Sequence, residues 1–263
     1  RLKLDHTDIY NKISPKFKEI ELLSETAMLF KSNMNDSMHN TLYENTIKLG
    51  EDLSAEIITT YLNDNGIQTK YLNFSNIIPN YPSQTINIQD TNITNNIYES
   101  FNKFSNEVSN KKYNSFVTSG YIGNWGNYGG ILNILNRGYT DYTSAMVSKA
   151  IQADKMVVYK ESSAIFTLNP TKYNNAKIID KMSFDELILL TNAGNEALHK
   201  NATNILKKEN IPITIRNAFN NIVEKTDIYS YNNNNKVVAL TEKNCYIIYA
   251  VSYTHLTLPT KRI

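Results

Sequence analysis

The residues of this chain that are best suited to chemistry gather between Phe116 and Pro170. Five of the nine glycines fall in one loop of this stretch, at positions 120, 123, 126, 129 and 130. Each glycine increases the entropy that the chain loses on folding, so a cluster of this kind needs a physical reason. A backbone that approaches a ligand closely supplies one. We therefore expect a ligand-binding loop here, between a buried strand and a helix.

The motif Arg137-Gly138-Tyr139-Thr140-Asp141 follows the glycine-rich loop. A guanidinium group can hold a carboxylate through two parallel hydrogen bonds, which makes Arg137 the natural partner for a substrate carboxylate. Thr140 and Asp141 begin a predicted helix, whose first N–H groups and positive dipole end can hold anionic oxygens. The alternative is structural, because such a turn can also serve only to cap the helix that follows.

Histidine and cysteine offer little to catalysis in this chain. The four histidines, at positions 6, 39, 199 and 255, show no spacing typical of a catalytic triad or of an H-x-x-x-H metal site. The single cysteine, Cys245, excludes an internal disulfide and a cysteine-rich zinc site. We therefore assign no metal ligand and no histidine chemistry.

The composition indicates a soluble protein. With 263 residues and 41% apolar content, the chain can bury one large core, or one domain and a fragment of another. A net charge of +2 argues against a nucleic-acid surface, and no stretch approaches the ~20 apolar residues of a membrane span. Because one cysteine also fits a reducing compartment, we expect a cytoplasmic protein without nucleic-acid or membrane partners.

Hydrophobic periodicity predicts alternating helices and strands. In the first half we expect a helical hairpin or a small helical insert over residues 4–48, a helix from Leu49 to about Asn65 ended by Gly66, a strand over Gln68–Leu72, a helix over Ile93–Val108 and a strand over Tyr113–Ser119. In the second half we expect a helix over 140–153, a strand over Met156–Lys160, a short extended piece over Ile165–Thr167, a helix from the capping box Ser183–Glu186 to about Thr191, a helix over Asn195–Lys208, a strand over Ile211–Ile215 and extended segments within Val237–Tyr249. This order favours an α/β sandwich with a largely parallel sheet, whose ligands lie beyond the carboxyl ends of the strands.

The motifs resemble those of aspartate kinase (aspartokinase), a member of the amino acid kinase family, and within it the fungal-type enzymes. These carry runs like T-G-F-F-G-x-x-x-G-G-L-L-N-x-x-G-R-G-Y-T-D, S-G-E-x-L-S and A-D-E-L-x-x-W-K-E. The matching residues here are Ser119–Gly123, Gly129–Asn133, Arg137–Asp141, Gly50-Glu51-x-Leu53-Ser54, Ala153-Asp154 and Tyr159-Lys160-Glu161. The resemblance covers roughly residues 1–250, and the R-G-Y-T-D block is its most specific part.

The resemblance implies a fold and a domain organisation. The fold is a three-layer αβα sandwich with a mostly parallel central sheet, the amino acid kinase fold, here without its amino-terminal strand. Residues 1–230 would form the catalytic domain, incomplete at its amino terminus, and residues 236–250 the start of a truncated ACT-type regulatory region. Residues 251–263 resemble the translation of a sequencing adapter, and we exclude them from the fold.

The resemblance also implies an activity. Aspartate kinases transfer the γ-phosphate of ATP to the β-carboxylate of L-aspartate, with Mg²⁺ bridging the phosphates, in the first step of lysine, threonine and methionine biosynthesis. The acceptor carboxylate is already an anion at pH 7, so catalysis should rest on positioning and on positive potential. The full-length protein is expected to be a homo-oligomer. The family's amino-terminal K-F-G-G-T-S strand has no counterpart here, so we expect this chain alone to be inactive.

Site residues are carried over by motif. Arg137 and Asp141 are the predicted catalytic residues, and with Glu51, Ser54, Gly120 and Tyr121 they form the predicted aspartate site. The predicted ATP-binding residues are Lys160, Glu161, Phe166, Asn169, Pro170, Lys172, Glu196, Arg216 and Asn217. Structural alternatives remain open: Glu51 as a first-turn charge favoured by a helix dipole, the Lys160–Glu161 pair as a solvated strand exit, and the segments around Glu196 and Arg216 as core elements.

The sequence departs from the family pattern at three places, and two of these, Ser162–Ala164 and Asn169, favour a different role, whereas the intact Glu51, Arg137 and Asp141 favour the enzyme. The family's V-D-G is Ser162-Ser163-Ala164 here, its D-P-R is Asn169-Pro170-Thr171, and its G-R is Asn136-Arg137. The alternative function is therefore a catalytically impaired relative that acts as an aspartate-binding or regulatory subunit. A third hypothesis, an amino acid kinase for another carboxylate or a carbamate, is weakened by the G-E-x-L-S and R-G-Y-T-D pair.

Overall fold

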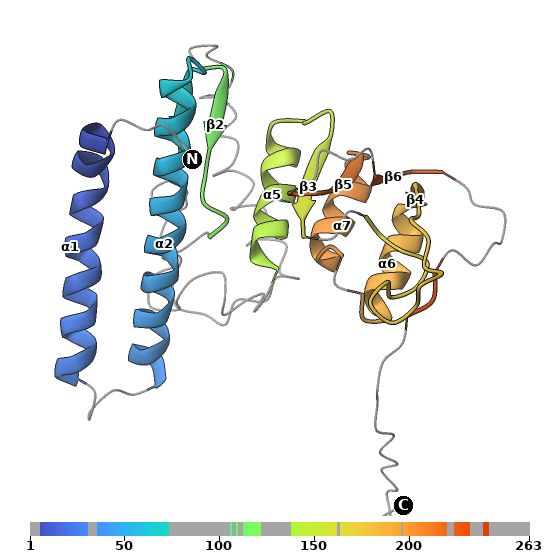
Figure 1. Cartoon of the computed structure of the whole chain (residues 1–263), viewed down its shortest axis with the longest axis horizontal. Coiled ribbons are helices and arrows are strands. Elements are labelled where there is room, and N and C mark those ends of the chain that lie inside the picture. The colour runs from blue at the N-terminus through green and yellow to red at the C-terminus, as the bar shows by residue number, and fades with distance from the viewer. Residues whose placement is uncertain are drawn as a thin grey trace, which may run out of the picture.

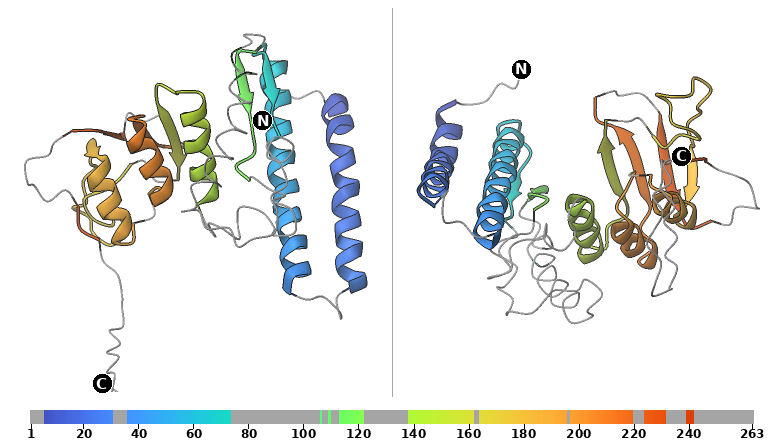
Figure 2. Two further views of the ribbon diagram at one scale, coloured as in Figure 1. Left: turned by 180° about the vertical axis from the view of Figure 1, so that it is seen from behind. Right: turned by 90° about the horizontal axis from the view of Figure 1, so that it is seen from below.

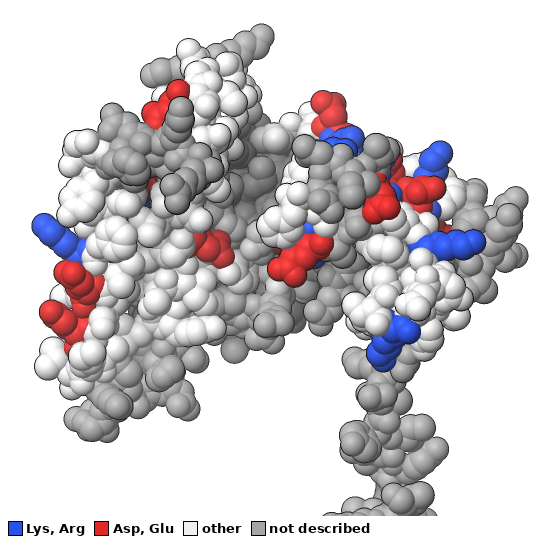
Figure 3. All heavy atoms as spheres, viewed as in Figure 1, with Lys and Arg blue, Asp and Glu red and all other residues white. Residues whose placement is uncertain are grey.

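A computed structural model of the chain describes residues 6–30, 36–73, 106, 109, 113–121, 138–161, 164–195, 197–219, 224–231 and 239–241. In Figure 1 these residues run from a pair of long helices, past a small sheet, to a second sheet with three shorter helices. Acidic and basic side chains of the described residues lie interspersed over the face shown in Figure 3. None of the described helices has the length and apolar character that a membrane crossing requires.

Two long helices begin the described part of the chain. Helix α1 spans His6–Phe30 and α2 spans Asp36–Asp64, and the two lie side by side in both views of Figure 2. This confirms the predicted helical hairpin. The predicted helix start at Leu49 is wrong, because α2 is continuous through Gly50. One glycine inside a helix costs only about 1 kcal/mol relative to alanine, which packing against α1 can offset.

The first sheet follows the end of α2. Gly66 has a φ of 80°, its N–H donates to the Asn63 carbonyl at 2.9 Å, and the N–H of Ile67 donates to the Leu62 carbonyl at 2.9 Å. This pair of bonds is the Schellman arrangement that a C′ glycine allows, as predicted. Strand β1, Thr69–Tyr71, then pairs in parallel with β2, Ser115–Val117, and α2 packs on both. The predicted helix over 93–108 lies outside the described residues, apart from residue 106.

The second sheet has four strands in the order β3-β5-β6-β4. They span Met156–Lys160 (β3), Lys181–Ser183 (β4), Ile213–Asn217 (β5) and Lys225–Tyr229 (β6). The β3–β5 and β4–β6 pairs are parallel, and the β5–β6 pair is antiparallel. The prediction of a mostly parallel sheet is therefore confirmed. The sequence patterns did not predict β4 and β6, although the buried Thr226 and Ile228 alternate with more exposed neighbours in β6.

Three helices cover one face of this sheet, as Figure 2 shows. They are α5, Tyr139–Ala150, α6, Phe184–Asn192, and α7, Lys200–Lys208. Between helices and strands lies the core: Ala145, Met156, Val158, Met182, Phe184, Leu187, Ala202, Leu206, Ile213, Ile215 and Ile228. Helices on mostly parallel strands make this an α/β fold. Helix α5 ends at Ala150, three residues before the predicted end.

The predicted starts of α6 and α7 had different outcomes. Ser183 accepts from the Glu186 N–H and Glu186 accepts from the Ser183 N–H, so the predicted capping box is present. The predicted helix over Asn195–Lys208 is present and ends at Lys208, but its predicted start is wrong, because α7 begins only at Lys200. Asn195 instead accepts a hydrogen bond from the Ala197 N–H at 2.9 Å, which forms an Asx turn ahead of the helix.

Candidate functional site

The predicted aspartate site begins at Glu51, where three separate segments meet. The N–H of Tyr121, just after β2, donates to Glu51 Oε2 at 2.7 Å. The hydroxyl of Tyr139, the first residue of α5, donates to Glu51 Oε1 at 2.5 Å. Glu51 lies in the middle of α2 rather than in a first helical turn, so the structural alternative of a dipole-favoured first-turn charge is wrong. Its carboxylate is instead oriented by two uncharged donors.

Two glycines allow the segments around Glu51 to approach each other. A Cβ on Gly120 would lie 2.6 Å from Thr140 Oγ1, closer than real Cβ atoms come to neighbouring atoms. The Gly120 carbonyl accepts from Thr143 Oγ1 at 2.7 Å, which joins this segment to α5. Gly138 has a φ of 87° and would place a Cβ 2.7 Å from His199 Cδ2. At Gly120 the backbone therefore lies close to the Thr140 side chain, and the predicted approach to a ligand stays a prediction. The other four glycines of the loop lie outside the described residues.

Asp141 connects the predicted aspartate site to the second sheet. Its Oδ2 accepts the backbone N–H of His199 at 3.0 Å and lies 3.7 Å from Lys160 Nζ at the end of β3. The N-cap of α5 is Gly138, which makes no side-chain capping bond. The alternative in which Thr140 and Asp141 serve only to cap this helix therefore does not describe the structure. The side chain of Asp141 makes its contacts outside α5.

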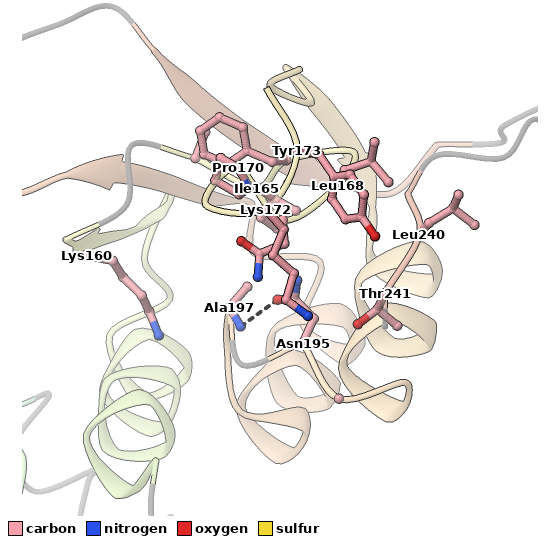
Figure 4. A pocket seen from close by; sticks show the side chains of 14 residues that line it. Lys160, Ile165, Leu168, Pro170, Lys172, Tyr173, Asn195, Ala197, Leu240 and Thr241 are labelled. Carbon is pink, nitrogen blue, oxygen red and sulfur yellow. Dashed lines mark hydrogen bonds between the residues drawn. The ribbon is translucent and has the colours of Figure 1, made fainter. Parts of the chain in front are cut away.

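A cleft of 690 Å³ lies beyond the end of β3 (Figure 4). Five predicted ATP-binding residues line it: Lys160, Phe166, Asn169, Pro170 and Lys172. The other lining residues are Ala164, Ile165, Leu168, Tyr173, Gly194, Asn195, Ala197, Leu240 and Thr241. A second cleft of 510 Å³ is lined by Lys160, Glu161, Thr140 and Asp141, among others. Lys160 therefore borders both clefts, and Asp141 lies beside it.

The remaining predicted residues occupy different positions. Asn217 Nδ2 donates to the Glu161 carbonyl at 2.6 Å, and the N–H of Ala218 donates to the Lys160 carbonyl at 2.8 Å, so Asn217 holds the ends of β3 and β5 together. Arg216 is exposed on β5 opposite Tyr159, and Ser54 is exposed on α2 one turn after Glu51. Arg137, Glu196, Ser162 and Ser163 lie outside the described residues.

Asn169 shapes the loop that borders the large cleft. Its Oδ1 accepts from the N–H of Thr171 at 3.0 Å and from Thr171 Oγ1 at 2.7 Å. Its carbonyl accepts from the N–H groups of Lys172 and Tyr173 at 3.1 and 3.0 Å. An aspartate side chain could accept the same bonds. The asparagine that departs from the family pattern is thus compatible with the loop geometry that an aspartate would give.

Sequence reasoning missed Tyr139 and His199. Tyr139 lies inside the R-G-Y-T-D motif, between its charged residues. Burial, and to a smaller extent the hydrogen bond to Glu51, raises the pKa of the Tyr139 hydroxyl well above its usual value. His199 caps α7 by accepting from the Asn201 N–H at 3.3 Å, and burial lowers the pKa of its imidazole while Asp141 opposes that shift. Its position, the last of the G-N-E-A-L-H motif, was the available signal.

Asp52 was missed as well, and no sequence signal distinguished it from its neighbours. Its side chain is buried beside Glu51, at 1% exposure. It accepts from the Tyr71 hydroxyl at 2.6 Å and from Asn73 Nδ2 at 3.3 Å, and it lies 3.8 Å from Lys16 Nζ of α1. These contacts set the rotation of α2 about its axis, and therefore the direction in which Glu51 points.

Comparison with known proteins shows the family of this chain. The model of the amino acid kinase family matches residues 3–217, and the chain belongs to that family. It is 31% identical to the aspartokinase of Saccharomyces cerevisiae over 215 residues, which is 82% of this chain and 40% of that protein. It is 30% identical to the aspartokinase of Candida albicans, over 72% of this chain and 35% of that protein. The chain thus spans less than half the length of these curated relatives.

Solved structures show the same fold. E. coli aspartokinase III in complex with lysine and aspartate aligns with a TM-score of 0.68 and 16% identity, over 88% of this chain and 49% of that one. Clostridium acetobutylicum aspartate kinase aligns with a TM-score of 0.54 and 20% identity, over 85% of this chain and 48% of that one. The family and the fold class expected from the motifs are therefore confirmed.

Proposed function

We propose that the protein containing this chain is an aspartate kinase, which transfers the γ-phosphate of ATP to the β-carboxylate of L-aspartate to give 4-phospho-L-aspartate. The observation that carries the proposal is the pairing of Asp141 with Lys160 at 3.7 Å, since it brings the Glu51 site next to the large cleft. A reaction between an amino acid and a nucleotide needs two such neighbouring sites. The similarity to fungal aspartokinases supports the same assignment.

On the amino acid side, Glu51 offers a carboxylate for the substrate's ammonium group. Its two oxygens already accept from Tyr121 and Tyr139, and a carboxylate has about four acceptor positions, so room remains for an ammonium donor. Gly120 and Tyr121 bring the backbone close to the same place. Arg137 is proposed by resemblance to bind a substrate carboxylate. E. coli aspartokinase III, which shares the fold, has been solved in complex with aspartate.

On the nucleotide side, the large cleft combines cations with an apolar wall. Lys160 and Lys172 can attract phosphates, whereas Phe166, Pro170 and Leu168 offer surfaces for a base. E. coli aspartokinase III has also been solved in complex with aspartate and ADP. We infer that this cleft binds ATP.

We propose that Mg²⁺ reaches the site with the phosphates of ATP. Magnesium keeps several waters and binds through one or two carboxylates together with substrate phosphates, rather than in a cage of protein ligands. Among the described residues, no group of three or more histidine, cysteine, aspartate or glutamate side chains could hold a metal ion. Asp141 and Glu161 are the carboxylates that line the 510 Å³ cleft next to Lys160, and they fit such a sparse ligand set. Bound there, Mg²⁺ would neutralise charge on the phosphates.

The chemical step then depends on position and charge. The β-carboxylate is already ionised at neutral pH, so it needs no general base before it attacks phosphorus. The obstacle is repulsion between this anion and the triphosphate, which lysine and arginine side chains reduce. The Lys160–Asp141 pair would keep the lysine at the border between the two sites. Asn169, with its aspartate-like turn, does not favour the alternative of a subunit without nucleotide chemistry.

Trapping of the acyl phosphate tests the proposed function. Full-length protein with ATP, Mg²⁺, L-aspartate and hydroxylamine should form aspartyl hydroxamate, and omission of either substrate should abolish it. Succinate, which lacks the ammonium group, serves as the control acceptor and should give far less product. If the protein binds aspartate and ATP but forms no hydroxamate, the aspartate-binding or regulatory subunit replaces the enzyme. We also propose, as part of the aspartate kinase assignment, that the full-length protein is cytoplasmic and forms a homo-oligomer.

A further inference from the structure

The Glu51 carboxylate is oriented by hydrogen bonds to both of its oxygens. Each of its two oxygens accepts one hydrogen bond, from the Tyr121 N–H at 2.7 Å and from the Tyr139 hydroxyl at 2.5 Å. Both bonds are short and fall on different oxygens, so rotation of the carboxylate about its last bond would break both. The plane of the carboxylate is therefore set before any ligand arrives.

The two donors are themselves fixed. The Tyr121 ring is buried, at 2% exposure, and packs edge-on against the Tyr139 ring with centroids 5.8 Å apart. The start of α5 is fixed against the Tyr121 segment by the Thr143–Gly120 bond at 2.7 Å. The hydroxyl of Tyr139 thus reaches Glu51 from a packed ring at the beginning of a helix, not from a free side chain.

We propose that Tyr139 is a positioning residue for the reaction, which holds the Glu51 carboxylate in the orientation that receives the ammonium group of the amino acid substrate. The inference rests on the proposed aspartate kinase function. It adds Tyr139 to the residues that the motifs predict for this site.

An uncharged donor suits this role better than a cation. A lysine or arginine on Glu51 would neutralise the carboxylate and compete with the substrate's ammonium group for it. A phenol and a backbone N–H orient the same carboxylate and leave its negative charge available. A carboxylate that is already oriented also loses less freedom when the substrate binds, and preorganisation of this kind increases affinity. A tyrosine hydroxyl keeps its proton at neutral pH in any case, and burial together with Glu51 raises the pKa of this one further.

The same geometry would also suit a different role. If the Tyr139–Glu51 bond were a latch that closes the site, the substrate would have to break it, and its removal would increase affinity for aspartate. The two roles predict opposite changes, so one variant distinguishes them. Tyr139→Phe removes the hydroxyl and keeps the ring that packs on Tyr121.

The test is steady-state kinetics with calorimetry on the full-length protein. For Tyr139→Phe we expect the KM and the Kd for L-aspartate to rise about tenfold, while kcat and the KM for ATP stay within about twofold. Tyr231→Phe is the matched control, because Tyr231 also bonds a glutamate, Glu186 at 3.3 Å, but lies away from the site. That variant should leave all these constants unchanged.

A double variant shows whether Tyr139 acts through Glu51. In a Glu51→Gln background, Tyr139→Phe should change the Kd for aspartate by less than about twofold. An unchanged or tightened Kd for the single variant, or a full tenfold effect without Glu51, would overturn the inference. If wild-type protein binds aspartate and makes no acyl phosphate, the proposed function fails, and the Kd of Tyr139→Phe still decides the role of Tyr139. Wild-type protein that binds no aspartate would overturn both.

Discussion

At the scale of single residues, the site depends on the absence of a side chain at Gly120. A Cβ there would lie within 2.6–2.9 Å of three atoms of the Thr140 side chain, at the first turn of α5. Gly120 therefore lies directly against the helix that carries Tyr139 and Asp141, and a displacement of one would displace the other. A methyl group at this position should therefore disturb both the fold and the pocket.

We predict that Gly120→Ala lowers the free energy of unfolding by about 1–3 kcal/mol and raises the KM for aspartate, since overpacking forces neighbouring atoms to shift. Urea denaturation and steady-state kinetics measure the two effects. Gly50→Ala is the matched control, because Gly50 lies in α2 with no atom within 4 Å of the added Cβ. That substitution should raise stability by about 0.5–1 kcal/mol. If the two variants changed the free energy of unfolding and the KM equally, a clash between the added Cβ and Thr140 would not explain the effect of Gly120→Ala.

At the scale of secondary-structure elements, α7 is capped by His199, whose capping bond depends on the protonation of its ring. His199 Nδ1 accepts from the Asn201 N–H at 3.3 Å, so the capping bond requires a ring that is unprotonated at Nδ1. Burial lowers the imidazole pKa in the folded protein below its ordinary value of 6.5, and Asp141 partly opposes the shift. The backbone N–H of the same residue donates to Asp141, so the cap of α7 and the site share one residue.

The folded state consequently binds a proton at His199 less readily than the unfolded state does. The stabilising contribution of neutral His199 should be fully present above about pH 6.5 and lost as the pH falls through the lower folded pKa. We predict that the free energy of unfolding falls more steeply between pH 7.5 and pH 5 in wild-type protein than in His199→Asn. Asparagine can cap the helix and does not titrate.

Urea denaturation across this pH range is the measurement, and the difference between the two proteins isolates His199 from the other titrating groups. His199→Ala should be less stable than His199→Asn by about 1 kcal/mol at pH 7.5, because it removes the capping acceptor. If the free energy of unfolding fell equally with pH in wild-type protein and in His199→Asn, protonation of His199 would not contribute to the loss of stability.

At the scale of the whole molecule, residues from beyond the matched family region border the large cleft. The family match ends at residue 217, yet Leu240 and Thr241 line the cleft and the Leu240 N–H donates to the Thr167 carbonyl at 2.9 Å. Figure 4 shows both side chains on the opposite side of the cleft from Lys160. The segment lies within residues 236–250, which by resemblance begin a regulatory region.

We predict that Leu240→Pro weakens ATP binding about three- to tenfold without changing aspartate affinity. Proline lacks the N–H that bonds Thr167, and a lost hydrogen bond of this kind is worth about 0.5–1.5 kcal/mol. Calorimetry with ATP and with aspartate gives both affinities, and Leu240→Ala, which keeps the N–H, is the control. Equal ATP affinity for wild-type protein and both variants would show that this wall does not contribute to binding.

The sequence by itself determined the features that depend on neighbouring residues. Strand β3 has the predicted bounds, Gly66 ends α2, and the Ser183–Glu186 capping box begins α6. Each of these signals acts between groups at most a few residues apart, so the local pattern suffices. The family, too, could be recognised from contiguous motifs.

Only the tertiary structure decided which distant groups meet. Glu51 and Tyr139 are 88 residues apart, and Asp141 and His199 are 58 apart, so no periodicity could reveal these bonds. Packing against α1 made α2 continuous through Gly50, and pairing with β5 and β4 made a strand of residues 225–229. Such contacts depend on how layers of helices and strands pack, because a side chain's partners across a core are set by the fold rather than by the residues beside it.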